Sequence, residues 1–194
     1  TDWGNIQCIQ FHKQKWENIT KQTGILNLAG WWNCITACDV DDDGDTDFVV
    51  GNRGWNSNYH PTETEPDWLI FGDMDGNARG EIIEIYTENG TLYPRRGFDS
   101  LSRSMPFLRD KFINFHQFST TDFTSMFPKD AIQKAYKKKV TTSTSGVLIN
   151  LGNGKLEFSP LPRLAQSAPI QDIIASDFNH DGTIRNEIYT LKNN

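Results

Sequence analysis

The sequence predicts a mainly β fold that is built from repeated hairpins and carries a helical insertion over residues 100–140. Three segments repeat one plan of apolar strand, acidic loop and second strand. Between the second and third repeats lies a basic stretch with apolar residues at helical spacing. Hydrophobic residues make up 37% of the 194 residues, which is enough for a core and excludes a wholly disordered chain.

The opening segment predicts the first hairpin. Residues 6–11 alternate between two faces as in a strand, residues 13–15 suit a turn, and residues 16–19 return as a short strand. Further on, we expect Trp31 and Trp32 in the core, because large aromatic side chains are mostly buried. Another hairpin is expected over residues 146–158, around the Gly-Asn-Gly turn at 152–154.

The three repeats occupy residues 33–52, 67–86 and 171–191. In each of them, apolar residues stand four and two positions before the opening Asp of the loop, and a small residue stands directly before it. Apolar β-forming residues follow each loop. A strand, a tight polar turn and a second strand form an antiparallel hairpin, so we expect three such hairpins.

The basic stretch predicts several short helices. Ser104-Met105-Pro106 is typical of a helix start, and Phe107, Leu108, Phe112 and Phe115 follow at helical spacing, so we expect them to face the body. Thr121 or Asp122 can cap a second helix. A last helix is expected over residues 131–139, with its lysines in solvent.

The first loop, residues 39–47, predicts a cation site. With the opening Asp counted as position 1, side-chain oxygens stand at positions 1, 3, 5 and 9, namely Asp39, Asp41, Asp43 and Asp47. Gly44 at position 6 allows a sharp bend, and the carbonyl at position 7 can add a ligand. This pattern suits calcium, which takes six to eight oxygen ligands. It is not an EF-hand, because Val50 stands where that motif needs a glutamate.

The second loop, residues 73–81, matches the ligand types at the same positions with Asp73, Asp75, Asn77 and Glu81. Ala78 replaces the glycine and Arg79 adds positive charge, so a plain polar turn is the alternative. The third loop begins with Asp177, Asn179 and Asp181, but position 9 is Arg185, which cannot bind a cation. Glu187 is the alternative ligand, or the register begins at Asn179.

These loops resemble the FG-GAP/VCBS repeats, the integrin α-like family, in its bacterial secreted branch related to ASPIC/UnbV-associated propellers. Phe71-Gly72 and Ala168-Pro169 before the second and third loops fit the same pattern. The resemblance implies a calcium-binding β-propeller, with the carbonyls of Asp45 and Arg79 among the ligands. Such propellers have about seven blades and this chain has material for about three or four. We therefore expect residues 1–194 to be one repeat domain that is a partial propeller.

Charge and motifs narrow the function. The net charge of −6 argues against nucleic-acid binding, and no apolar run is long enough to span a membrane. The four histidines lie in unrelated contexts and no nucleophile elbow or P-loop occurs, so we expect no enzyme.

The resemblance implies a rigid recognition or adhesion scaffold for a protein or glycan, located outside the cell, in the periplasm or on the cell surface. An accessory propeller of a larger secreted enzyme, glycan-active or redox, is the alternative. Exposed blade edges predict self-association.

Overall fold

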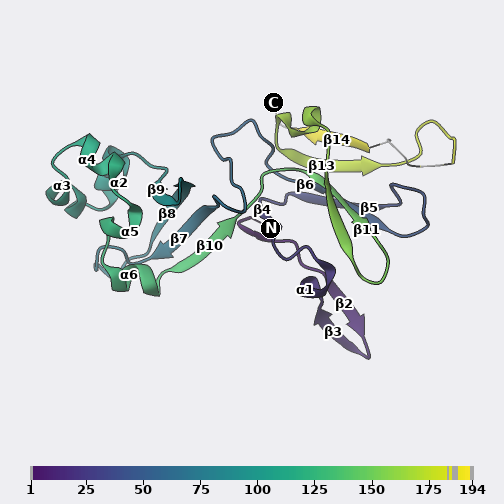
Figure 1. Ribbon diagram of the computed structural model, residues 1–194, viewed down its shortest axis with the longest axis horizontal. Coiled ribbons are helices and arrows are strands. Elements are labelled where there is room, and N and C mark those ends of the chain that lie inside the picture. Colours follow the sequence, from purple (N-terminus) through teal and green to yellow (C-terminus); the bar gives the residue numbers. More distant parts are fainter. Residues whose placement is uncertain (1, 183, 185–187, 193–194) are drawn as a thin grey trace. The chain divides into compact units, whose positions relative to one another are not determined.

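Strands are the commonest regular element in the computed structural model of the chain, which describes residues 2–182, 184 and 188–192 (Figure 1). The predicted mainly β class is confirmed. The chain divides into two compact units, whereas we expected one repeat domain. Unit 1 comprises Thr1–His60 and Val140–Asn194, and unit 2 comprises Pro61–Lys139. The difference arises because unit 2 buries a hydrophobic core of its own.

A four-stranded antiparallel sheet forms the centre of unit 1, in the order β12-β11-β6-β5. The first repeat supplies β5 (Cys34–Cys38) and β6 (Asp47–Gly51), paired as the predicted hairpin. The hairpin expected around residues 152–154 supplies β11 (Gly146–Asn150) and β12 (Leu156–Pro160). Val147 of β11 pairs with Val49 of β6, which joins two hairpins that are far apart in the sequence.

The third repeat forms the hairpin β13 (Ile170–Ala175) and β14 (Ile188–Lys192), which packs against β5 and β6. The Thr36 hydroxyl donates to the Ile173 carbonyl over 2.8 Å, and the Ile170 N–H donates to the Asn52 carbonyl over 3.0 Å. Ile170, Ile173 and Val49 share one buried cluster. The first and third repeats therefore lie together in space.

The N-terminal part of unit 1 contains two further strand pairs. Gly4–Asn5 (β1) pairs with Ala29–Gly30 (β4), and Ile9–His12 (β2) pairs with Lys15–Asn18 (β3) as the predicted first hairpin. Helix α1 (Thr20–Thr23) follows, and a 3-10 turn covers Arg163–Ser167. Trp31 and Trp32 are buried, as expected.

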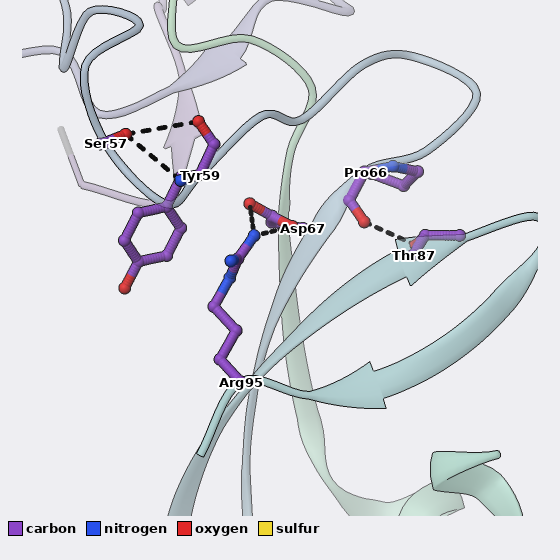
Figure 2. A network of polar contacts seen from close by, with 6 residues as sticks. All are labelled: Ser57, Tyr59, Pro66, Asp67, Thr87 and Arg95. Carbon is purple, nitrogen blue, oxygen red and sulfur yellow. Dashed lines mark hydrogen bonds and ion pairs between the residues drawn. The ribbon is translucent and has the colours of Figure 1, made fainter. Parts of the chain in front are cut away.

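Unit 2 contains a four-stranded sheet in the order β10-β7-β8-β9. The second repeat forms the predicted hairpin β7 (Asp67–Gly72) and β8 (Glu81–Glu88), and β9 (Thr91–Pro94) returns along β8. Arg95 Nη2 lies 2.6 Å from both carboxylate oxygens of Asp67, and the Thr87 hydroxyl donates to the Pro66 carbonyl over 2.6 Å (Figure 2). These contacts hold the start of β7 to β8 and to the chain that leaves β9.

Five short helices cover this sheet. They are α2 (Phe98–Ser104), α3 (Phe107–Lys111), α4 (Phe115–Thr120), α5 (Phe123–Met126) and α6 (Lys129–Lys134). Leu108 of α3, Phe112 directly after α3 and Phe123 of α5 pack with Ile83 and Ile85 of β8 in one buried cluster. Asp122 caps α5 as predicted, because its carboxylate accepts from the Thr124 N–H.

Two expectations for residues 100–140 are wrong. The last helix ends at Lys134, because Ala135 adopts an extended conformation, and Tyr136–Val140 forms strand β10 at the edge of the sheet. Lysines are common on edge strands, where they oppose pairing with another chain, so the lysine run that suggested a solvated helix end is equally suited to an edge. Phe115 is 57% exposed rather than buried.

Within the described ranges the sheets are small and antiparallel, and none closes into a barrel. No helix in this part of the chain is long and apolar enough to cross a membrane.

Candidate metal centres

Each of the three acidic loops connects the two strands of one hairpin. Loop A (residues 39–47) joins β5 to β6, loop B (73–81) joins β7 to β8, and loop C (177–185) lies between β13 and β14. Thr183 and Arg185 of loop C, and Glu187 beyond it, lie outside the described residues. The loops can therefore be compared position by position over their first six residues.

The carboxylate at position 1 organises every loop in the same way. In loop A, Asp39 accepts from the N–H groups of Asp43 and Gly44, at positions 5 and 6, over 3.2 and 2.9 Å. Asp73 accepts from the same two positions of loop B over 3.1 and 2.9 Å, and Asp177 from those of loop C over 3.1 and 2.8 Å. Each opening Asp thus binds the backbone of the turn that follows it.

The backbone of the loops is also the same. Positions 4 and 6 are left-handed in all three, although their residue types differ. The φ angles at these positions are 59° and 88° for Asp42 and Gly44, 79° and 63° for Gly76 and Ala78, and 61° and 89° for His180 and Gly182. Glycine favours such angles and other residues adopt them at a cost. Loop B therefore carries its glycine at position 4 and accepts an alanine at position 6.

The carboxylate at position 9 closes loops A and B. One oxygen of Asp47 accepts from the Val40 N–H at position 2 over 2.9 Å, and one oxygen of Glu81 accepts from the Met74 N–H, also position 2, over 2.9 Å. Asp47 is fully buried, and its other oxygen accepts from the Asn150 N–H of β11 over 2.7 Å. Asp47 therefore also connects its loop to a neighbouring strand.

Two groups of carboxylates converge closely enough to hold a metal ion. The ligand oxygens of Asp39, Asp41 and Asp43 all lie within 4.8 Å of one another, and those of Asp73, Asp75 and Glu81 do so in loop B. Asp47 is outside the loop A group, and both of its oxygens accept from backbone N–H groups. Glu81 is inside the loop B group, where its longer side chain reaches from the same position.

The remaining predicted ligands contribute to the turn. The N–H groups of Asp45 and Arg79 at position 7 each donate over 2.8 Å to the side chain at position 5, which is Asp43 or Asn77. In loop C, the Asn179 amide donates to the Asp181 carboxylate over 3.0 Å. Among the described residues of loop C, only Asp177 and Asp181 supply carboxylates, and they form no converging group of three.

The pKa values of two loop carboxylates, Asp41 and Asp73, are shifted in opposite directions. Burial, followed by the negative charges of Asp43 and Asp47, raises the pKa of Asp41. Burial also acts to raise the pKa of Asp73, but the N–H groups of Ala78, Gly76 and Asn77 outweigh it, so this pKa is lowered. Burial and repulsion by neighbouring carboxylates therefore act in the same direction on Asp41, whereas donated hydrogen bonds outweigh burial at Asp73. A bound cation offsets such repulsion.

Loop B also borders a cavity of about 290 Å³, lined in part by charged side chains, that the sequence did not indicate. Asp73 and Asp75 lie on one side of it, and Asp130 and Lys134 of α6 lie on the other. No sequence signal relates α6 to the loop, because the two are separated by all of β8, β9 and four helices. The cavity leaves loop B accessible to solutes.

Comparison of the chain with protein-family models, with curated proteins and with solved structures gave no match.

Proposed function

We propose that the chain is a calcium-binding module of repeated β-hairpins that presents a rigid surface outside the cell, as an FG-GAP/VCBS-like segment of a β-propeller. The observation that carries this proposal is the shared geometry of loops A and B. Two loops of different sequence have one backbone conformation and each gathers three carboxylates within 4.8 Å. A hard cation with oxygen ligands is the group that such an arrangement suits.

Calcium is preferred to magnesium because the loops offer irregular sets of carboxylate and carbonyl oxygens. Calcium accepts six to eight oxygens in flexible geometry, whereas magnesium demands a regular octahedron and keeps most of its waters. Extracellular calcium modules bind with dissociation constants of about 10⁻⁴–10⁻³ M, which suits an environment rich in calcium. This affinity range is why we place the protein outside the cell, in the periplasm or on the cell surface.

A structural role is favoured over catalysis because the loop carboxylates already accept hydrogen bonds from the backbone. Asp39, Asp73 and Asp47 accept hydrogen bonds from the backbone of their own loops, and Asp39 and Asp73 also belong to the converging groups. A rigid hairpin also offers no pair of helices that could swing open on binding metal, which argues against a calcium sensor. The proposed module therefore acts through the surface that its hairpins hold in place, toward a protein or a glycan.

Calcium titration of matched variants tests the proposal. Asp41→Asn and Asp42→Asn each remove one negative charge from loop A, but only Asp41 belongs to the converging group. We expect isothermal titration calorimetry to show calcium binding to the unaltered chain, a loss of at least about tenfold in affinity at loop A for Asp41→Asn, and little change for Asp42→Asn. Asp75→Asn should act in the same way on loop B.

Thermal unfolding supplies the second measurement. A ligand that binds only the folded chain raises its stability, so calcium should raise the unfolding midpoint above that measured in EDTA. Identical midpoints in calcium and EDTA would refute the metal proposal. Equal effects of Asp41→Asn and Asp42→Asn would reduce it to a general attraction between calcium and an acidic surface.

A further inference from the structure

The hairpin β2–β3 differs from every other strand pair of unit 1 in its exposure. All eight residues of Ile9–His12 and Lys15–Asn18 are exposed. Figure 1 shows the hairpin extending away from the central sheet of unit 1. A two-stranded hairpin is marginally stable in water unless one face packs against something. We therefore expect one face of this hairpin to pack against a partner surface.

The hairpin has one apolar and one polar face. Phe11 pairs with Trp16 across the strands, and their ring centroids are 5.0 Å apart. Ile9 lies two residues before Phe11 and so shares its face. These side chains are 49% (Ile9), 57% (Phe11) and 72% (Trp16) exposed. The opposite face carries Gln10, His12, Lys15 and Glu17. Exposed aromatic residues gathered on one face are typical of an interaction site.

The base of the hairpin is fixed to unit 1. The Cys8 N–H donates to the Thr20 hydroxyl over 2.8 Å, and the Ile19 N–H donates to the Cys8 carbonyl over 2.9 Å. Lys155 in turn donates to the Gln22 carbonyl over 2.7 Å, which ties α1 to the β11–β12 turn. The apolar face is therefore presented in a defined direction.

Unit 1 also carries an apolar groove of about 470 Å³. Val40, Val147 and Leu161 form part of it, together with Leu164, which is 81% exposed. The groove has room for side chains of the size of Phe and Trp, since pockets of about 300–1,000 Å³ hold drug-sized groups. The same unit thus contains an exposed aromatic face and an open apolar groove.

Charge relates the two surfaces. Lys13 and Lys15 stand at the tip of the hairpin. Val40 on the wall of the groove lies between Asp39 and Asp41 in loop A, which holds six carboxylates within residues 39–47. The loop remains negative even with one divalent cation bound. The positive charge of the hairpin tip is therefore attracted toward the loop A side of the groove.

We propose that the β2–β3 hairpin of one copy of the chain inserts Phe11 and Trp16 into the apolar groove of a second copy, with its lysines toward loop A. Each copy carries both surfaces, so the proposed exchange is reciprocal about a two-fold axis and joins a pair of chains. Aromatic anchors in an apolar pocket with a charged rim are the usual composition of a protein interface.

Variants at exposed positions test this without harming the fold. Trp16→Ser removes an anchor, Leu164→Asp places a charge in the groove, and Ile113→Ser alters an apolar residue of unit 2 that is 90% exposed. In sedimentation velocity over a concentration series, the unaltered chain and Ile113→Ser should form pairs. Trp16→Ser and Leu164→Asp should each weaken the pairing at least about tenfold. A mixture of these two variants should associate more strongly than either alone, because it restores one hairpin–groove contact.

Three results would overturn the proposal. The first is a single copy of the chain at all concentrations, and the second is pairing that Leu164→Asp leaves unchanged. The third concerns vesicles that contain phosphatidylserine. If the chain binds them through Trp16 but not through Leu164, the hairpin faces a lipid surface rather than a second copy. Higher salt should also weaken the pairing, and pairing that is indifferent to salt would contradict the predicted role of the lysines.

Discussion

Loops A and B reach one backbone conformation with different residues. Loop A carries its glycine at position 6 and Asp42 at position 4, whereas loop B carries Gly76 at position 4 and Ala78 at position 6. In both, the opening Asp accepts from the N–H groups at positions 5 and 6. The shared element is therefore the carboxylate and not the glycine. The comparison teaches that side-chain hydrogen bonds to the backbone can impose a turn that residue preference opposes at one position.

Substitution at position 9 should produce the largest difference between the two loops in the free energy of unfolding. Asp47 is fully buried and accepts from two backbone N–H groups, whereas Glu81 is half-buried and one such bond is observed. We expect Asp47→Ala to lower the free energy of unfolding by about 3 kcal/mol, and Glu81→Ala by about 1 kcal/mol, because unpaired buried N–H groups are costly. Urea unfolding in EDTA, followed by circular dichroism, measures both.

Asp47→Asn is the matched control, since its one amide oxygen can still accept from one of the two N–H groups. Asp47→Asn should lower the free energy of unfolding relative to the unaltered chain, but by less than Asp47→Ala does. Equal losses for Asp47→Ala and Glu81→Ala would show that the buried connection to β11 does not distinguish the loops.

Exchanging glycine and alanine at position 6 should change the free energy of unfolding by less than the substitutions at position 9 do. The change should have opposite signs in the two loops. Gly44→Ala should lower the free energy of unfolding by about 1 kcal/mol, because alanine at a φ of 88° is strained. A Cβ added at Gly44 meets nothing within 4 Å, so the change reports backbone strain alone. Ala78→Gly should raise the free energy of unfolding by about 0.5 kcal/mol, since strain is relieved while the unfolded chain gains freedom. Thermal or urea unfolding in EDTA measures the pair.

Gly76→Ala at position 4 of loop B is the control for this exchange. Its φ of 79° predicts a loss similar to that of Gly44→Ala. If Ala78→Gly lowers the free energy of unfolding, the left-handed backbone of Ala78 is not a source of strain in loop B.

The smallest effect should be seen in acid titration of the metal-free chain. The pKa of Asp41 is raised by burial and by neighbouring carboxylates, so its ionisation opposes folding and protonation as the pH falls relieves that opposition. The pKa of Asp73 is lowered, so its contribution to stability is present above the unfolded value of about 3.9 and is lost as the pH falls through the folded pKa. Carboxyl ¹³C NMR titration in EDTA should place the two midpoints on opposite sides of about 3.9. Midpoints in the reverse order would contradict the contrast between Asp41, where burial and repulsion raise the pKa, and Asp73, where hydrogen bonds lower it.

The sequence predicted what depends on local pattern. Alternation and turn residues gave the three repeat hairpins and the hairpin around Gly152–Gly154, and oxygen spacing located the acidic loops. The left-handed position 4 was missed because Asp42, Gly76 and His180 share no residue type. Strand β10 was missed because a lysine run fits a helix end and an edge strand equally well.

Contacts between distant segments could not be predicted either. The Asn150 N–H reaches Asp47 from a strand that follows in the chain only after all of unit 2, and no local pattern encodes it. The division into two units likewise depends on which apolar residues pack together. Except for Phe115, the phenylalanines of the insertion pack with residues of β7 and β8 in a core that belongs to unit 2.

The division of the chain has a consequence for the order of folding. Unit 2 is one continuous segment, whereas β6 and β11, which are adjacent in the sheet of unit 1, come from segments on either side of it. During synthesis from the N-terminus, unit 2 can therefore fold before unit 1 has all of its strands. A folded unit 2 brings the flanking segments closer than a flexible linker would, and so lowers the entropic cost of joining them. Damage to the core of unit 2 should thus slow the assembly of unit 1, although no residue of that core belongs to unit 1.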